Sequence, residues 1–465
     1  MRPWLSKSLF FSKKKLTHTL ALLLLHDHLL TRNGISTSTG PLKSAILRHK
    51  ARLQAEFTRA RLRRGHSSVA ALLAATKKEQ EGEGRIPRWV RVNTLRSTLD
   101  AVVAALGDDY TPVESLAQLL AAKEEKVHYY CKDPIVANLL AFPPGTDFTA
   151  HPLYTNGTLI LQDRSSCFPA HLLAPPPGAW VIDATAAPGN KTTHLAALLL
   201  DGAGGGGGVI AFEKDARRTE VLRDMVRRAG GEAVITIRGN EDFLRCDPSS
   251  EPLLSRVTHI LLDPSCSGSG IVNRAEYALI PLAATAAQQG KKRKGDAGEQ
   301  AAKGRLQELS RFQKAMILQA MLFPSAVKIC YSTCSVHAEE NEQVVVSVLG
   351  SETAKTRGWR VERRAEGTLS DWPRRGVREH CGGGEEGREV AEACVRCRPI
   401  EDGGIGFFVV AFVRDAEQVE VVEVEQEEEW QGFSDAEQVE VEVEQEEEWQ
   451  GFSGQVAAPK KRRTA

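Results

Sequence analysis

The sequence predicts an α/β fold built on a doubly wound, Rossmann-like parallel sheet, and three observations lead to this prediction. Between residues 155 and 414, short apolar runs alternate with segments of helical periodicity, as in βαβ units. Turn residues follow most of these runs. Acids stand at several run ends, including Asp183, Glu213 and Asp263. Open α/β sheets bind ligands at the carboxyl ends of their strands, so these positions mark the expected ligand edge.

Residues 1–84 predict a helical, basic N-terminal region. Apolar residues between positions 42 and 57 recur at helical spacing, and basic residues fill the positions between them. One helix face would then pack and the other would contact phosphate, whereas a merely solvated face is the alternative. The basic residues are Lys43, Arg48, Lys50, Arg52, Arg59, Arg61, Arg63 and Arg64.

Residues 85–154 predict a small α+β unit, with a strand over residues 89–93 and a helix over residues 99–106. A catalytic-type α/β domain is expected over residues 155–414, and it contains an insertion at 283–304 that is predicted to be disordered. Residues 415–465 form an acidic tail that contains an internal repeat and ends in a basic cluster. The density of Glu predicts that this tail is disordered as well.

The segment from residue 179 to residue 213 indicates a nucleoside cofactor. A strand pattern over 179–183 leads into the small-residue turn ATAAPGNKT at 184–192 and then into a helical run. Small residues let the backbone approach a ligand closely, and free N–H groups at a helix start bind carboxylates. A second strand ends at Glu213, where an acid can hold a ribose diol. A dinucleotide is not expected, because no G-x-G-x-x-G stands between strand and helix.

Two cysteines lie just after the ends of two different apolar runs, Cys266 in LLDPSCSG and Cys334 in ICYSTCS. Both thiols are expected at the carboxyl ends of neighbouring parallel strands, where a nucleophile belongs. A single free cysteine is more often a small core residue, but two at two strand ends favour chemistry. A thiol pair beside an adenosyl cofactor indicates methyl transfer.

Several segments together resemble the Sun-type (nucleolar protein/Sun) family of RNA cytosine-5 methyltransferases, in the order of that family, over residues 85–412. The matching segments are RVNT (91–94), LQDRSS (161–166), DATAAPGNKT (183–192), DPSCSGSG (263–270), YSTCS (331–335), EENE (339–342) and GFFV (406–409). Pro-Ser-Cys, Gly-Asn-Lys and HPLY (151–154) resemble the eukaryotic branch that methylates large-subunit rRNA.

The resemblance implies a Rossmann-like methyltransferase that uses S-adenosyl-L-methionine and forms 5-methylcytosine in RNA. Carbon 5 of cytosine is a weak nucleophile, so a thiolate first adds to carbon 6 and a covalent intermediate splits the step. The family implies Cys334 as the attacking thiol, Cys266 as the group that assists elimination, and Asp263 at the pyrimidine edge. It implies that the cofactor contacts Thr185, Ala186, Ala187, Pro188, Gly189, Asn190, Lys191, Glu213, Asp242 and Asp263.

Two other functions share parts of this pattern. A DNA cytosine methyltransferase uses the same addition chemistry, but there the cysteine of the Pro-Cys type motif attacks, so Cys266 would be essential and Cys334 dispensable. A non-catalytic ribosome-assembly factor could retain the fold as an RNA clamp. The presence of Thr333-Cys334 argues against the first, and intact Cys266, Cys334, Asp263 and Lys191 argue against the second.

The charge balance favours a polyanion as the partner, and the resemblance implies that this partner is RNA, as large-subunit rRNA or a pre-ribosome. The formal net charge is zero, but residues 415–453 hold 16 acids and no bases, which leaves 44 acids against 60 bases and a net of +16 elsewhere. The basic end at 459–463 can serve as a nuclear address, which predicts the nucleus and nucleolus. A mitochondrial presequence is the alternative, because the first 25 residues contain no acid.

Nine cysteines without a paired framework predict a reducing compartment. Cys394-x-x-Cys397 lacks a second pair of the spacing that zinc sites use, so no metal is expected. The apolar run at 20–25 is far shorter than a spanning helix, and no membrane association is expected.

Overall fold

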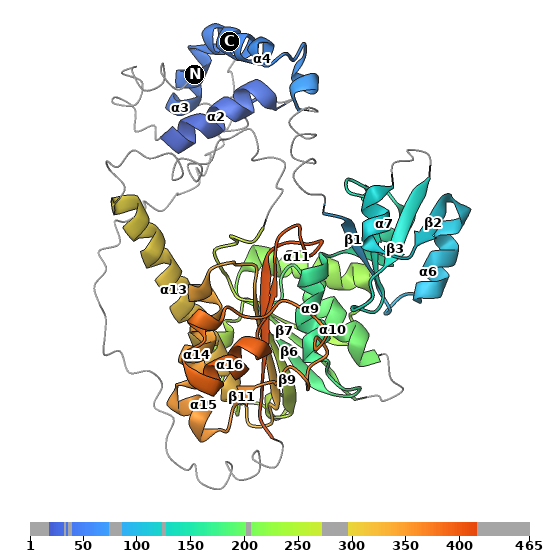
Figure 1. The fold of residues 1–465 in the computed structure, drawn as a ribbon, viewed down its shortest axis with the longest axis vertical. Helices are drawn as coiled ribbons and strands as arrows, with labels where there is room; N and C mark the ends of the chain where they lie inside the picture. Colours follow the sequence, from blue (N-terminus) through green and yellow to red (C-terminus); the bar gives the residue numbers. More distant parts are fainter. Residues whose placement is uncertain are drawn as a thin grey trace, which may run out of the picture. The chain divides into compact units, whose positions relative to one another are not determined.

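The structure is a computed structural model, and it describes residues 18–31, 34–35, 40–73, 86–122, 127–200, 206–271 and 296–415 (Figure 1). The predicted disordered tail lies outside the described residues, apart from Asp415. The predicted insertion at 283–304 lies outside them up to residue 295. From Asp296 onward the chain is helical, so α13 begins inside the range predicted for the insertion. Ala, Glu, Gln and Lys in this stretch are strong helix formers and extend the amphipathic helix that follows.

The N-terminal region is helical, as predicted, but its basic stretch forms two helices rather than one. The helices are α2 (His18–Leu30), α3 (Pro41–Leu47) and α4 (Lys50–Arg63). They share a small apolar cluster that includes Leu24, Ile46 and Leu53. A turn at residues 48–49 separates α3 from α4, and Leu47 is consequently 42% exposed instead of packed.

The small α+β unit is a five-stranded sheet in the order β2-β3-β4-β1-β5, with helices α6 and α7. The bounds are β1 (Arg88–Val92), α6 (Leu99–Leu106), β2 (Tyr110–Val113), α7 (Leu116–Ala121), β3 (His128–Lys132), β4 (Leu139–Phe142), α8 (Pro152–Thr155) and β5 (Leu159–Leu161). Strand β5 pairs antiparallel with β1. The unit therefore continues beyond the predicted boundary at residue 154, because a three-residue strand leaves too little pattern in the sequence to assign it to either sheet.

The catalytic-type domain contains an eight-stranded sheet in the order β11-β13-β10-β9-β6-β7-β8, with β12 paired to β13. Strands β6 to β10 run parallel, whereas β13 runs antiparallel to β10. The strands are β6 (Trp180–Asp183), β7 (Gly208–Glu213), β8 (Ile235–Gly239), β9 (Val257–Leu262), β10 (Lys328–Thr333), β11 (Arg360–Val361), β12 (Val395–Cys397) and β13 (Phe407–Val413). This is the doubly wound sheet that the sequence predicts.

Helices cover both faces of this sheet, as Figure 1 shows. One layer contains α9 (Arg164–Leu173), α10 (Asn190–Leu200) and α11 (Ala216–Ala229). The other contains α13 (Asp296–Met321), α14 (Glu342–Leu349), α15 (Glu352–Thr356) and α16 (Gly384–Ala393). The short α12 (Pro252–Ser255) precedes β9.

Alternate strand residues supply the two cores, because successive side chains in a strand point to opposite faces. In β7, Val209 and Ala211 pack in the core of the α9–α11 side, whereas Ile210 and Phe212 pack in the core of the α13–α16 side. Cys397 in β12 and Cys394 at the C-terminal end of α16 also lie in different clusters. Since these two thiols belong to opposite cores, the C-x-x-C spacing does not form a metal pair. Within the described residues, no group of three His, Cys, Asp or Glu side chains is arranged to hold a metal.

The small unit is joined to the catalytic-type domain by buried hydrogen bonds from β1 and the turn after it. Asn93 is fully buried, and its side-chain N–H groups donate to the carbonyls of Gly157 and Ala229, both at 2.9 Å. The Trp89 indole N–H donates to the carbonyl of Gly403 at 2.6 Å. No described helix is long and apolar enough to cross a membrane.

Replacing Asn93 tests this junction. We expect Asn93→Ala to lower the free energy of unfolding by about 2 to 4 kcal/mol, because two buried carbonyls lose their donors. Arg96→Ala is the matched control, because Arg96 donates across the same junction to the Arg228 carbonyl but is exposed. That variant should lose less than about 1 kcal/mol. Urea unfolding followed by tryptophan fluorescence measures both, and equal losses would contradict the junction.

Candidate active site

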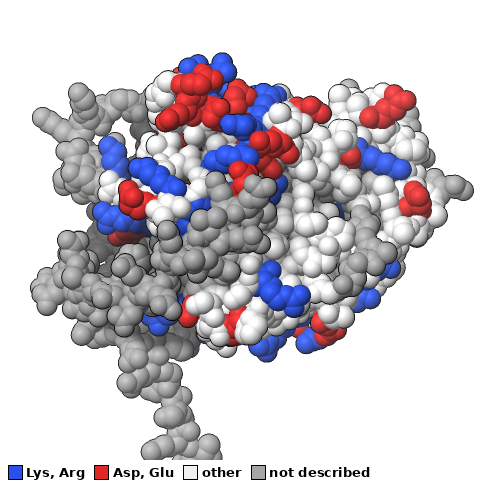
Figure 2. Space-filling view, turned by 90° about the horizontal axis from the view of Figure 1, so that it is seen from below, with Lys and Arg blue, Asp and Glu red and all other residues white. Residues whose placement is uncertain are grey.

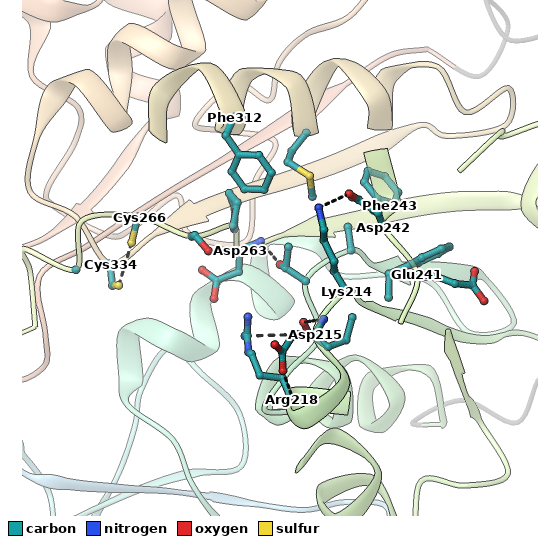
Figure 3. Close-up of a pocket in the computed structure, with 18 of the residues that line it drawn as sticks. Lys214, Asp215, Arg218, Glu241, Asp242, Phe243, Asp263, Cys266, Phe312 and Cys334 are labelled. Carbon is teal, nitrogen blue, oxygen red and sulfur yellow. Dashed lines mark hydrogen bonds and ion pairs between the residues drawn. The ribbon is translucent and has the colours of Figure 1, made fainter. Parts of the chain in front are cut away.

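The carboxyl ends of the parallel strands β6, β7, β8 and β9, together with the end of β10, enclose a cavity of about 940 Å³ (Figure 3). Its walls include residues predicted to bind the cofactor and residues predicted to be catalytic. Thr185, Glu213 and Asp242 line one part, and Asp263, Cys266 and Cys334 line another. The structure therefore brings together these six predicted residues on the edge where the sequence placed them.

The two predicted cysteines face each other across this edge. The Sγ atoms of Cys266 and Cys334 lie 3.2 Å apart, within hydrogen-bond distance, and both residues are half-buried (Figure 3). The loop after β9 reaches the loop after β10 a second time, since the Gly270 N–H donates to the Cys334 carbonyl at 2.9 Å. Two thiols that follow separate strands thus share one rim of the cavity.

The contact between the thiols changes their acidity. A hydrogen bond from Cys334 lowers the pKa of Cys266, and this effect outweighs the opposing effect of burial. The same hydrogen bond, with burial added, raises the pKa of Cys334. When the first proton leaves, the remaining S–H donates to the thiolate and stabilises it. The pair therefore loses its first proton readily and its second with difficulty. The Lys191 ammonium opposes this rise in the pKa of Cys334 but does not cancel it.

Asp263 is held by two side chains that orient its carboxylate. One oxygen accepts from the Lys191 ammonium at 2.7 Å, and the other accepts from the Ser332 hydroxyl at 2.8 Å. Burial works against the charge on Lys191, but the Asp263 carboxylate more than offsets it, so the pKa of Lys191 is raised. Lys191 also donates to the Ser166 hydroxyl at 3.1 Å. Ser332 and Ser166 lie in matched motifs, but sequence reasoning gave neither a role.

The far end of the cavity holds two acids at successive strand ends. Glu213, at the end of β7, is buried and accepts from the Asp215 N–H at 3.0 Å. Asp242 follows β8, accepts from the Leu244 N–H at 3.1 Å and pairs with Lys214 at 2.7 Å. Burial opposes the charge of Asp242, but the hydrogen bond from Lys214 outweighs burial, so the pKa of Asp242 is lowered. Two carboxyl groups at this end match the hydroxyl and amino donors of a nucleoside.

The remaining predicted cofactor residues, Ala186 to Lys191, do not line this cavity. They form the turn from β6 to α10 behind it, where Ala186 and Ala187 are buried. Gly189 has a φ of +109°, and a Cβ there would lie 2.9 Å from Met225, so the turn needs glycine. The turn supports Thr185, whose hydroxyl accepts from the Asp263 N–H at 3.1 Å. Their contact with a cofactor stays a prediction.

Asp183, directly before this turn, was not predicted as a site residue. It is 1% exposed, and burial raises its pKa to about 6. Its carboxylate accepts from the Thr192 hydroxyl at 2.8 Å and so closes the turn across its base. A strand-terminal acid followed by small residues was the available signal, but it did not separate a supporting acid from a ligand.

Three family descriptions match consecutive parts of the chain. The description "16S rRNA methyltransferase RsmB/F" matches residues 170–412. Two descriptions of NOL1/NOP2/Sun domain family member 5 match residues 86–162, as its ferredoxin-like domain, and residues 3–73, as its N-terminal domain. The ferredoxin-like match includes β5, in agreement with the observed sheet.

Proteins with curated functions are similar over most of the chain. The 25S rRNA (cytosine-C(5))-methyltransferase rcm1 of Schizosaccharomyces pombe is 41% identical over 85% of this chain and 77% of its own length. The 28S rRNA (cytosine-C(5))-methyltransferase of Mus musculus is 37% identical over 88% of this chain and 79% of its own length. A solved methyltransferase homolog protein from Pyrococcus horikoshii shares the fold, with 22% identity, a TM-score of 0.51 and coverage of 72% of this chain and 88% of that chain.

These matches confirm the predicted resemblance and favour an enzyme over both alternatives, the DNA methyltransferase and the non-catalytic assembly factor. The fold, the thiol pair and the family assignment agree over the same residues. The chain belongs to the RsmB/F family of rRNA (cytosine-C5)-methyltransferases, in the branch of NOL1/NOP2/Sun domain family member 5.

Proposed function

We propose that this enzyme transfers a methyl group to carbon 5 of a cytosine in large-subunit rRNA through a transient bond between Cys334 and carbon 6. Two relatives that are similar over most of the chain carry names that specify large-subunit rRNA. The observation that carries the proposal is the 3.2 Å contact between the thiols of Cys266 and Cys334 at the rim of the cavity.

S-adenosyl-L-methionine, the methyl donor of this class of enzyme, supplies an electrophilic methyl group when bound. The donor set of the cavity fits it, because Glu213 and Asp242 offer carboxylate oxygens to a ribose diol and an adenine amino group. Phe243 follows Asp242 and adds an aromatic wall. Thr185 and Asp263 lie between this end and the two thiols, which is where the methionine side of the donor would have to lie.

In the proposed reaction the thiolate of Cys334 adds to carbon 6 of the cytosine, and the electron density that moves to carbon 5 takes the methyl group. Asp263 contacts the pyrimidine edge. Its two oxygens already accept from Lys191 and Ser332, which keeps it an acceptor. We infer that it accepts from the exocyclic amino group of cytosine instead of donating a proton to N3.

The second half of the reaction needs a base. The proton on carbon 5 must leave before the bond between Cys334 and carbon 6 can break and return the thiolate. Cys266 lies beside the attacking sulfur, so as a thiolate it is placed to accept this proton.

We propose that the enzyme acts in the nucleus, and specifically in the nucleolus on a pre-ribosome. The names of the relatives, which specify 25S and 28S rRNA, support this placement. A family match over residues 3–73 supports a domain there over a mitochondrial presequence. The basic cluster at 459–463, which predicts a nuclear address, lies outside the described residues.

Two cysteine variants separate the proposed roles. We expect Cys334→Ala to abolish methyl transfer, because no bond to carbon 6 forms. We expect Cys266→Ala to form the bond but release it slowly, so a covalent RNA–protein band accumulates. The measurement is a denaturing gel after incubation with rRNA and S-adenosyl-L-methionine. Cys246→Ala is the matched control, since Cys246 is half-buried and lies outside the cavity. No retarded band from Cys266→Ala would show that the roles are misassigned.

Exposed arginines of the N-terminal region give a second prediction. On the face shown in Figure 2, Lys and Arg side chains lie among Asp and Glu, so the described surface there is mixed in sign. On α11, Arg223 pairs with Glu220 and Arg227 pairs with Asp224. Arg48, Arg63 and Arg64, by contrast, are exposed around α4 in a stretch that contains a single acid.

We expect the triple change of Arg48, Arg63 and Arg64 to Gln to weaken RNA binding and to reduce the slope of log affinity against log salt by roughly 2 to 3. Filter binding over a range of salt concentrations measures both quantities. Unchanged affinity at every salt concentration would contradict phosphate contacts by these side chains. Arg223→Gln with Arg227→Gln serves as the control for loss of charge alone.

A further inference from the structure

Two consecutive polar residues, Glu340 and Asn341, lie behind the thiol pair and are both fully buried, with 0% of each residue exposed. They belong to the turn between β10 and α14. Neither lines the cavity, and neither has a place in the reaction described above. Their side chains point to different loops, and each holds one of the two reactive cysteines.

Glu340 holds the loop of Cys266 together with Gln313 of α13. The Ser267 N–H donates to the Glu340 carboxylate at 2.8 Å, directly after Cys266. The Gln313 side-chain N–H donates to the Ser265 carbonyl at 3.1 Å, directly before Cys266, and to the same Glu340 oxygen at 3.2 Å. The peptide groups on both sides of Cys266 are therefore fixed by one buried carboxylate–amide pair.

Asn341 holds the loop of Cys334 in an analogous way. Its side-chain oxygen accepts from the Thr333 hydroxyl at 2.6 Å, and its side-chain N–H donates to the Ser335 carbonyl at 3.0 Å. Both residues that flank Cys334 thus bind the same amide. Because an amide offers a donor and an acceptor in one plane, a single Asn can fix both sides at once.

Burying the Glu340 carboxylate lowers the stability of the fold, so its presence calls for another explanation. Among the described residues no cation pairs with Glu340, and its second carboxylate oxygen has no hydrogen bond there. A buried acid without a cation lowers stability relative to an apolar side chain of the same size. What Glu340 provides is an acceptor for the peptide N–H that follows Cys266.

We propose that Glu340 and Asn341 are positioning residues that set the spacing of the two reactive thiols, Glu340 through the Cys266 loop and Asn341 through the Cys334 loop. Because the two residues are adjacent in the chain, a displacement of one loop relative to the other requires that a buried hydrogen bond break. The step-specific part of this inference rests on the proposed roles of Cys334 and Cys266; the spacing itself does not.

The first test measures the spacing without reference to catalysis. Alkylation of Cys266 by iodoacetamide is followed by mass spectrometry across a pH range in the full-length protein. We expect Glu340→Ala to move the midpoint of alkylation to higher pH, because Cys266 loses the thiol hydrogen bond that lowers its pKa. Glu340→Gln keeps one acceptor oxygen in place and should retain the wild-type profile. Glu339→Ala is the matched control, since the neighbouring Glu339 is exposed.

The second test separates the two loops by reaction step. We expect Glu340→Ala to increase the lifetime of the covalent RNA adduct by about tenfold or more, as a displaced Cys266 would. We expect Asn341→Ala to slow formation of the adduct by about tenfold or more without accumulation. If Glu340→Ala does not fold, Gln313→Met removes the other anchor of the Cys266 loop, the hydrogen bond to the Ser265 carbonyl. Thr333→Val removes one hydrogen bond of Asn341 while conserving shape.

The outcomes distinguish this inference from the proposed function. An unchanged alkylation profile in Glu340→Ala, with adduct trapped by Cys266→Ala, overturns the positioning role and leaves the function intact. A shifted profile with no adduct from Cys266→Ala supports the positioning role and overturns the assigned roles of the thiols. An equal slowing of both steps by Glu340→Ala and Asn341→Ala, with Glu340→Gln equally impaired, overturns the division between the two loops.

Discussion

The parallel pairing of β9 with β10 is the constraint on which the rest of the site depends. In this register Leu262 lies opposite Tyr331, so both strands end at the same edge of the sheet and deliver Cys266 and Cys334 to it. Pairing alone does not bring two thiols within 3.2 Å, because the chains diverge once the strands end. The loop after β9 is drawn back at Gly270, where the Gly406 N–H donates to its carbonyl at 2.8 Å and a Cβ would collide with the Gly406 backbone. The contact therefore depends on β9, β10 and the segment before β13 together.

The contact between the thiols, more than burial, sets the acidity of Cys266. Burial raises the pKa of Cys167 to about 12, and it raises the pKa of Cys330 still further, so cysteines in this interior are inert by default. Cys266 departs from this pattern because a second thiol donates to its sulfur. This explains why the positions of both loops matter so strongly. A shift of about 1 Å would return Cys266 to the behaviour of an ordinary buried thiol.

The sequence predicts a secondary-structure element well where one residue pattern is confined to that element. Continuous apolar runs in β7 and β10 identify strands buried on both faces, and the acids and cysteines that follow strands identify the ligand edge. It does not reveal the partners of Lys191, Glu340 or Asn341. The motif that contains the last two residues was recognised, but its contacts reach Ser267, Thr333 and Ser335 across the fold. Such contacts depend on how three loops close over one another, and no local periodicity encodes that closure.

Arg91 shows that buried hydrogen bonds also link the site to the small unit. Its guanidinium, on β1, is 1% exposed and donates to the Gln162 side chain, the Asn190 carbonyl and the Thr193 hydroxyl. None of these partners is an acid, and burial lowers the pKa of Arg91 to about 10. The cation is therefore held by dipoles at the beginning of α10, next to the turn predicted to contact the cofactor. A helix start is a poor place for a positive charge, so this contact persists only because the sheet of the small unit fixes β1 there. The position of that sheet and the shape of the turn predicted to contact the cofactor consequently depend on each other.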